Sequence, residues 1–175
     1  MLAKSLVING TIMIYEIDGL LSYLKELVLS AQSVQTNAQA PYSGFKVGAA
    51  VLDIHGHVSL GVNVERCTYT QTTHAEQNAI DSLVAQHGPV AIEVIAICGI
   101  NQPRKINRYN ISLNDIIFPC GHCLQIIWEN CSNKNTAIIS DLGDNLVAMS
   151  DIGSLLPVRF GPNNLNLNVF EPRRA

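Results

Sequence analysis

The chain has 175 residues, which is enough for one domain with its own hydrophobic core. Hydrophobic residues make up 47% and charged residues 14%, as in a rather apolar globular protein. The net charge is −3, so the chain has no overall positive field that would attract a nucleic acid. We therefore expect a single domain over residues 1–175 whose partner is a small molecule.

Targeting and redox signals are weak. The N-terminal apolar run is interrupted by Asn9 and Gly10, which makes it too short for a membrane span and a poor match to a secretory signal. The five cysteines include only one C-x2-C pair. An odd cysteine count of this kind is typical of metal binding in a reducing compartment, not of disulfides. We expect a cytoplasmic protein that contacts no membrane.

The first half of the chain predicts two helices and a hairpin. Apolar residues at helical spacing predict a helix over residues 18–35. Residues 46–52 and 58–64 flank a turn-forming segment and predict two paired strands. A second helix is expected over residues 73–86, with Thr72 or Thr73 as its N-cap and Gly88 as its stop.

The second half predicts three more strands and two more helices. Residues 91–100 form a continuous apolar run, as in a strand buried on both faces. Pro119 leads into a helix over residues 120–130, strands follow over 137–140 and 146–149, and a short helix covers 151–155. Helices that alternate with about five strands indicate an α/β domain with helices on the faces of a sheet.

The most informative motif combines one imidazole with two thiols. His74 precedes Glu76 by two residues, and Cys120 and Cys123 are three residues apart at the start of a predicted helix. Three protein ligands leave a tetrahedral Zn²⁺ ion one position for water, as in catalytic zinc sites. The H-x-E…P-C-x-x-C pattern is the signature of zinc deaminases that act on bases. Glu76 is then free to carry protons between the water and the base.

A structural zinc site is the alternative interpretation. Cys67 or Cys131 would then be the fourth ligand, and Glu76 would lie on a helix surface with no function. The catalytic interpretation explains why a glutamate stands at this position, and the structural one does not. His122, between the two cysteines, is expected to pack in the loop and not to bind the metal.

Five segments together resemble the cytidine deaminases of pyrimidine salvage. The segments are PYSGFKVGAA (41–50), GVNVE (61–65), HAEQ (74–77), PCGHCLQ (119–125) and LLPVRFGP (155–162). The resemblance covers residues 41–165 and implies a three-layer α/β/α domain with a mixed, about five-stranded sheet and one Zn²⁺ ion per subunit. The resemblance begins only after Met13, so we expect residues 1–15 to be an extra N-terminal segment.

The resemblance implies roles for residues outside the zinc motif. Asn63 and Glu65 would bind the ribose hydroxyls, and Phe45 would lie against the pyrimidine face. Without the resemblance, the first two are equally well explained as turn residues, and Phe45 as an ordinary core residue. Ala75 would offer its backbone N–H to the base carbonyl, and Phe118 its backbone carbonyl to the departing amine.

Phe160 would approach the site of a neighbouring subunit, which implies a homo-oligomer. A chain with one deaminase core resembles the short, tetrameric branch of the family, whereas His74 resembles the longer, dimeric branch. A tetramer is favoured, and a dimer stays open.

The chain departs from the family pattern at three places. Gln77 follows Glu76 where members with three cysteine ligands have an arginine; His74 removes one thiolate charge and with it the need for that arginine. Leu124 replaces another common arginine. Residues 101–117 are longer than the usual connection, and long irregular connections often serve a function.

These residues predict hydrolysis of cytidine and 2′-deoxycytidine to the uridine nucleosides and ammonia, with Glu76 as the catalytic residue. One alternative is a deaminase for a modified cytosine nucleoside such as a nucleoside antibiotic. Another is a zinc-stabilised protein that binds nucleosides without turnover. Editing of polynucleotides is disfavoured, because it needs a basic groove and aromatic stacking platforms.

Overall fold

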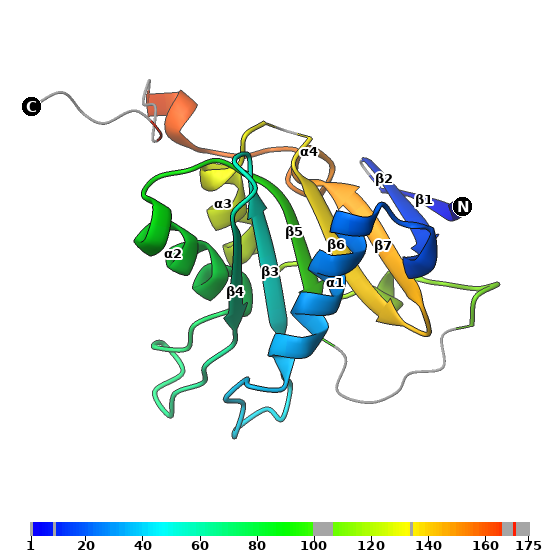
Figure 1. Cartoon of the computed structure of the whole chain (residues 1–175), viewed down its shortest axis with the longest axis horizontal. Helices are drawn as coiled ribbons and strands as arrows, with labels where there is room; N and C mark the ends of the chain where they lie inside the picture. Colours follow the sequence, from blue (N-terminus) through cyan, green and yellow to red (C-terminus); the bar gives the residue numbers. More distant parts are fainter. Residues whose placement is uncertain (1, 9, 100–106, 134, 166–169, 171–175) are drawn as a thin grey trace, which may run out of the picture.

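A computed structural model gives the fold (Figure 1) and describes residues 2–8, 10–99, 107–133, 135–165 and 170. The strands are β1 (Leu2–Ile8), β2 (Gly10–Glu16), β3 (Gly48–Asp53), β4 (Val58–Val62), β5 (Ile92–Cys98), β6 (Ala137–Gly143) and β7 (Leu146–Asp151). The α-helices are α1 (Ser22–Gln35), α2 (Ala75–His87), α3 (Gly121–Asn130) and α4 (Ile152–Leu155).

The strands form one mixed sheet in the order β1-β2-β7-β6-β5-β3-β4. β5 and β6 are parallel, and every other neighbouring pair is antiparallel. The predicted α/β class and the mixed sheet are therefore confirmed. All four predicted α-helices and the five predicted strands are present, with ends shifted by a few residues.

Helices cover both faces of the sheet, which confirms the three layers. Alternation along β3 directs Ala50 to the core beneath α1, and Ala49 and Val51 to the core beneath α2, α3 and α4. β5 contributes buried side chains to both cores, as expected for a strand with two covered faces. Within the described segments, every helix is too short or too polar to cross a bilayer.

The expectation of about five strands is corrected by two further strands at the N-terminus. β2 lies antiparallel to β7, with Met13 opposite Met149, and β1 folds back on β2. Ile12 and Ile14 of β2 are fully buried at alternate positions. The sequence does not reveal these strands, because β2 becomes buried only by pairing with β7, about 130 residues away.

Candidate active site

The candidate site forms where the N-termini of two helices meet. His74 is the N-cap residue of α2 and Cys120 is that of α3, both with extended backbone angles. The predicted Thr72 or Thr73 cap is therefore wrong: α2 begins after His74, and no side chain caps its N-terminus. The N-termini of two helices carry partial positive charge, which favours negative charge nearby.

The three predicted ligands lie together. Nδ1 of His74 is 3.5 Å from Sγ of Cys120 and 3.3 Å from Sγ of Cys123, and all three ligand atoms lie within 4.8 Å of one another. A tetrahedral Zn²⁺ ion at its usual bond lengths separates nitrogen from sulfur by about 3.5 Å. The donor set and its spacing therefore fit one zinc ion.

Burial controls the protonation of this cluster. Cys123 is fully buried, and burial together with the negative charges of Glu76 and Cys120 raises the pKa of its thiol far above the ordinary range. The thiol is therefore protonated in the metal-free fold, and a bound cation must displace that proton. Glu76, in the first turn of α2, is also buried.

A glycine in β4 allows α2 to approach the sheet closely. A Cβ atom on Gly61 would lie 2.3 Å from the backbone nitrogen of Ala79 and 2.4 Å from the carbonyl oxygen of Ala75. These are backbone atoms of α2, so they cannot move aside without the helix. Gly61 therefore fixes how close the helix that begins at His74 lies to β4.

We expect Gly61→Ala to destabilise the fold by about 2–3 kcal/mol, because the helix backbone cannot absorb the extra methyl group. It should also lower the zinc content, since α2 carries His74. Denaturant unfolding and metal analysis measure the two effects. Gly121→Ala is the matched control, because its Cβ would meet no atom within 4 Å. Unchanged stability of the Gly61 variant would contradict the role of close packing.

A cavity of about 320 Å³ opens beside the cluster, within the size range of small-molecule sites. Its lining residues are Ser43, Phe45, Val47, Asn63, Glu65, Thr72, His74, Ala75, Glu76, Ile97, Ile117, Phe118 and Cys120. The structure thus brings together every predicted substrate-binding residue except Phe160. The side chain of Phe160 is 61% exposed and lies outside this cavity.

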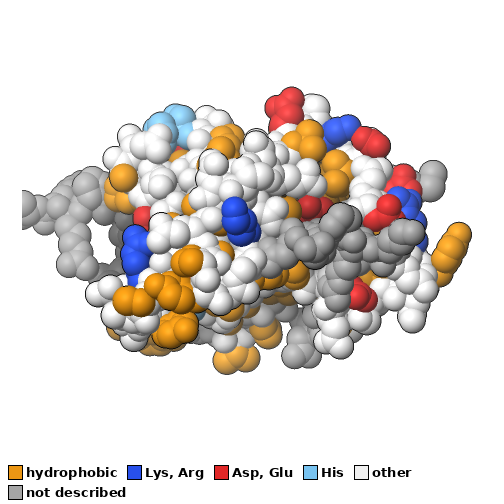
Figure 2. Space-filling model, turned by 90° about the horizontal axis from the view of Figure 1, so that it is seen from below, with side chains coloured by type: hydrophobic (Ala, Val, Ile, Leu, Met, Phe, Trp, Pro, Cys, Tyr) orange, Lys and Arg blue, Asp and Glu red, His pale blue; other side chains and the backbone are white. Residues whose placement is uncertain are grey.

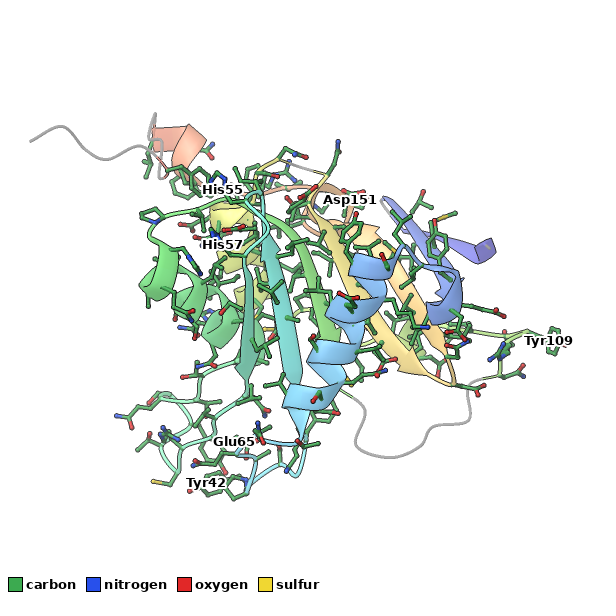
Figure 3. The ribbon with its side chains drawn as sticks, viewed as in Figure 1. Tyr42, His55, His57, Glu65, Tyr109 and Asp151 are labelled. Atoms are coloured by element: carbon green, nitrogen blue, oxygen red, sulfur yellow. The ribbon has the colours of Figure 1, made fainter. Side chains whose placement is uncertain are left out.

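Glu65 and Asn63 also hold one wall of the cavity in place. The Glu65 carboxylate accepts hydrogen bonds from the Ser43 hydroxyl and from the backbone N–H groups of Tyr42 (2.8 Å) and Ser43 (3.2 Å). Asn63 donates to the Phe45 carbonyl and accepts from the Val47 N–H, both at 2.8 Å. Figure 3 shows Glu65 beside Tyr42 at the lower end of the sheet. These contacts fix the segment that carries Phe45.

The Ser43 hydroxyl, assisted by the two backbone N–H groups, lowers the pKa of Glu65 below its ordinary value. Glu65 therefore stays ionised throughout the neutral range. Two further residues of segment 41–50, Ser43 and Val47, also line the cavity, and the sequence alone did not single them out as site residues. Ile97 and Ile117 also line it, but an apolar residue in a strand or loop gives no sequence signal of that role.

His122 lies elsewhere than predicted. It occupies the first turn of α3 and does not pack in a loop. Its Nε2 atom is 3.4 Å from Oε1 of Gln77, and its ring meets the His74 ring edge-on at 5.5 Å. Leu124 is partly buried against the core beneath α2, where it fills apolar space.

The remaining cysteines and histidines lie outside the cluster. Cys98 and Cys131 are buried and Cys67 is exposed, and no described cysteine supplies a fourth ligand. His57 makes two defined side-chain contacts. Its Nδ1 atom lies 2.8 Å from the buried carboxylate of Asp53, and its ring stacks on His87 at 3.8 Å. Figure 3 places His57 at the end of the sheet opposite Glu65.

Comparison with known families decides the relationship. Residues 22–138 match the model of the cytidine and deoxycytidylate deaminase zinc-binding region, and they include His74, Glu76, Cys120 and Cys123. The chain belongs to this cytidine deaminase family. The resemblance inferred from the five motifs is therefore confirmed.

Curated relatives agree with this cytidine deaminase assignment. Cytidine deaminase 6 of Arabidopsis thaliana is 34% identical over 149 residues, which are 82% of this chain and 45% of the relative. The chain thus spans about half the length of that plant protein. The cytidine deaminase of Sporosarcina psychrophila is 27% identical over 144 residues, which cover 82% of this chain and 95% of the relative.

Solved structures of cytidine deaminases share the fold. The Mycobacterium tuberculosis enzyme has a TM-score of 0.63 and 27% identity, and the match covers 81% of this chain and 98% of that one. The Burkholderia pseudomallei enzyme has a TM-score of 0.62 and 30% identity, covering 81% and 100%. This cytidine deaminase family member therefore has a fold and a candidate zinc centre of the family type.

Proposed function

We propose that the protein hydrolyses cytidine and 2′-deoxycytidine to uridine and 2′-deoxyuridine with release of ammonia. One observation carries the proposal. Glu76 is buried beside the His74, Cys120 and Cys123 cluster, in a cavity that Asn63 and ionised Glu65 also line. A proton-transfer group and a possible sugar-binding pair therefore share one cavity of suitable size.

Zinc and Glu76 have different roles in the proposed hydrolysis. When bound, zinc would lower the pKa of a water molecule to about 7 and so supply the nucleophile for C4 of the base. Glu76 takes a proton from that water and passes it to the ring nitrogen, and then carries the next proton to the departing amine. The bond between C4 and the exocyclic nitrogen breaks, ammonia leaves, and the water oxygen becomes the new carbonyl oxygen.

The other cavity residues bind and orient the nucleoside. Phe45 packs on the base, and Asn63 and Glu65 offer amide and carboxylate groups to the ribose hydroxyls. The Ala75 N–H donates a hydrogen bond to the base carbonyl, and the Phe118 carbonyl accepts one from the leaving amine. These roles are proposals based on the family resemblance and on the shared cavity.

The charge of the cavity favours nucleosides over nucleotides. Among the described residues, its lining contains two glutamates and no lysine or arginine. A phosphate on the sugar would therefore face ionised Glu65 without a cation from this part of the lining, which is electrostatically unfavourable. Figure 2 likewise shows only scattered Lys and Arg side chains on the face that it presents, which gives no support for a polynucleotide substrate.

We therefore expect turnover of cytidine and 2′-deoxycytidine, and at least about 100-fold lower kcat/KM for deoxycytidylate, a penalty of roughly 3 kcal/mol. A spectrophotometric assay on purified, zinc-loaded protein measures all three. The panel should include a cytidine with a bulky base substituent, because Ile117 of the longer connection lines the cavity and could favour a modified nucleoside. Faster turnover of that analogue than of cytidine would identify a modified nucleoside as the substrate.

Nucleoside binding without any product, even at high protein concentration, would instead support the binding-protein alternative.

We further propose a single domain over residues 1–175 and a cytoplasmic homo-oligomer, tetrameric or dimeric. Val158 and Phe160 are 91% and 61% exposed, and we propose that a second copy of the chain covers them. Light scattering measures the oligomeric state.

A further inference from the structure

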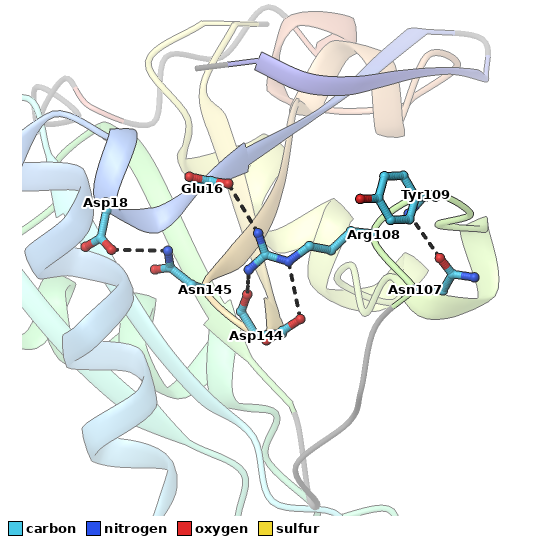
Figure 4. A network of polar contacts seen from close by, with 7 residues as sticks. All are labelled: Glu16, Asp18, Asn107, Arg108, Tyr109, Asp144 and Asn145. Carbon is cyan, nitrogen blue, oxygen red and sulfur yellow. Dashed lines mark hydrogen bonds and ion pairs between the residues drawn. The ribbon is translucent and has the colours of Figure 1, made fainter.

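The Arg108 side chain links the connection before Pro119 to the end of β2. Arg108 donates from Nη1 to Oε1 of Glu16 at 3.2 Å and from Nη2 to the Asp144 carbonyl at 2.7 Å, and its Nε lies 3.4 Å from Oδ2 of Asp144. Figure 4 shows this network. Glu16 ends β2, and Asp144 lies in the turn between β6 and β7. Arg108 therefore joins three segments that are far apart in the sequence.

The partners of Arg108 are themselves well fixed. Asp144 and Asn145 both have positive φ angles, 53° and 62°, as in the tight turns that connect paired strands. Asn145 donates to Asp18 at 3.1 Å, and its carbonyl accepts from the Ile17 N–H at 2.9 Å. The acceptors of Arg108 thus belong to one hydrogen-bonded unit that includes the end of β2.

An apolar contact follows along the same connection. Ile111 is 3% exposed and is buried in one cluster with Ile12 and Ile14 of β2. Ile116 and Phe118 pack against this cluster, and Phe118 also packs against the core beneath α2. β2 and the described part of the long connection therefore bury each other.

The end of this connection is a wall of the cavity. Ile117 and Phe118 both line it, and the Ile117 carbonyl accepts a 2.8 Å hydrogen bond from the Ser140 hydroxyl. A Cβ atom on Gly99 would lie 3.0 Å from Cζ of Phe45 and 3.1 Å from Cγ2 of Ile117. The side chains of Phe45 and Ile117 thus approach the same glycine closely, and a small shift of Ile117 would alter the space beside Phe45.

We propose that Arg108 is a positioning residue for the nucleoside. With Ile12 and Ile14 of β2, it holds the wall formed by Ile117 and Phe118, and so sets the affinity for the base. The inference rests on the proposed function for the identity of the ligand. His74 and Glu76 are at the start of α2, outside the contacts of Arg108, so loss of these contacts is expected to weaken nucleoside binding more than it slows the chemical step.

Arg108→Gln tests the proposal in the zinc-loaded full chain. We expect KM for cytidine to rise about three- to tenfold, less than the ~100-fold that a 1 Å misplacement can cost. The value of kcat should stay within about twofold, and the metal content and the melting temperature should not change. Arg108→Lys, which keeps the charge but not the forked geometry, should restore part of the affinity. Glu93→Gln is the control, because Glu93 is the exposed residue of β5 and takes no part in the Arg108 contacts.

A second variant tests the route of the effect. Glu16→Gln removes the negative charge of one partner of Arg108, and the double variant with Arg108→Gln should bind no more weakly than Arg108→Gln alone, because both changes weaken one contact. Hydrogen exchange should rise at the amides of Ile116 and Ile117 in the variants and not in Glu93→Gln.

The outcomes separate this proposal from the proposed function. An unchanged KM in Arg108→Gln, or a fall in kcat at constant KM, overturns the positioning role while cytidine turnover stands. If the wild type shows no turnover, calorimetric titration with cytidine and uridine replaces KM, and the same three- to tenfold loss of affinity is expected. A wild type that neither binds nor converts these nucleosides would overturn both proposals.

Discussion

Replacing Glu76 with glutamine is expected to lower kcat for cytidine by about 10²–10⁴-fold, the usual contribution of a positioned acid–base group. Glutamine has nearly the same shape as glutamate but cannot accept and return a proton. Because Glu76 is buried in the cavity and is not among the three metal ligands, the variant should keep its fold and its zinc. Absorbance of cytidine and metal analysis of the same sample measure both properties.

Glu93→Gln is the matched control, because Glu93 is the exposed residue of β5. Its kcat should equal that of the wild type. Equal and measurable rates for the wild type and Glu76→Gln would assign proton transfer to another group. Near-zero rates in both proteins would leave the family assignment intact but reject cytidine as the substrate.

Removal of zinc is expected to abolish turnover, and stoichiometric Zn²⁺ should restore it. Only the His74, Cys120 and Cys123 cluster offers three metal-binding atoms within 4.8 Å among the described residues. Cys123→Ala should therefore reduce the bound zinc well below one ion per subunit. Cys67→Ser is the control, since Cys67 is an exposed free thiol outside the cluster. Full zinc content in Cys123→Ala would contradict the ligand assignment.

Zinc binding should also depend on pH with a defined sign. Burial raises the pKa of Cys123 in the metal-free fold, so the thiol holds its proton at neutral pH. Each proton that zinc displaces makes the apparent affinity rise about tenfold per pH unit. Competition with a coloured chelator between pH 6 and 8 measures the slope. An affinity independent of pH would show that no proton is displaced in this range.

The zinc site could be predicted because its signal is local. His74 and Glu76 are two residues apart, Cys120 and Cys123 are three apart, and each pair begins a helix. A catalytic zinc ion needs this combination of donors, and few other roles explain it. The helices and five central strands were equally visible, since burial gives their sequences a regular period.

Other features depended on contacts between distant segments. The sequence did not predict β1 and β2, because they are strands only through pairing with each other and with β7. It singled out the long connection before Pro119 but could not show that Arg108 and Ile111 bind it to β2. Ile117 became a cavity residue for the same reason.

The sequence by itself determined the family, the candidate metal-binding residues and the proposed proton carrier, because these depend on which chemical groups stand at short, fixed spacings. Only the tertiary structure decided what lies around them. Ile97 and Ile117 form part of the cavity lining, and Arg108 links the connection that carries Ile117 to β2. Such contacts follow from the packing of surfaces that lie far apart along the chain, and no local pattern of residues encodes them.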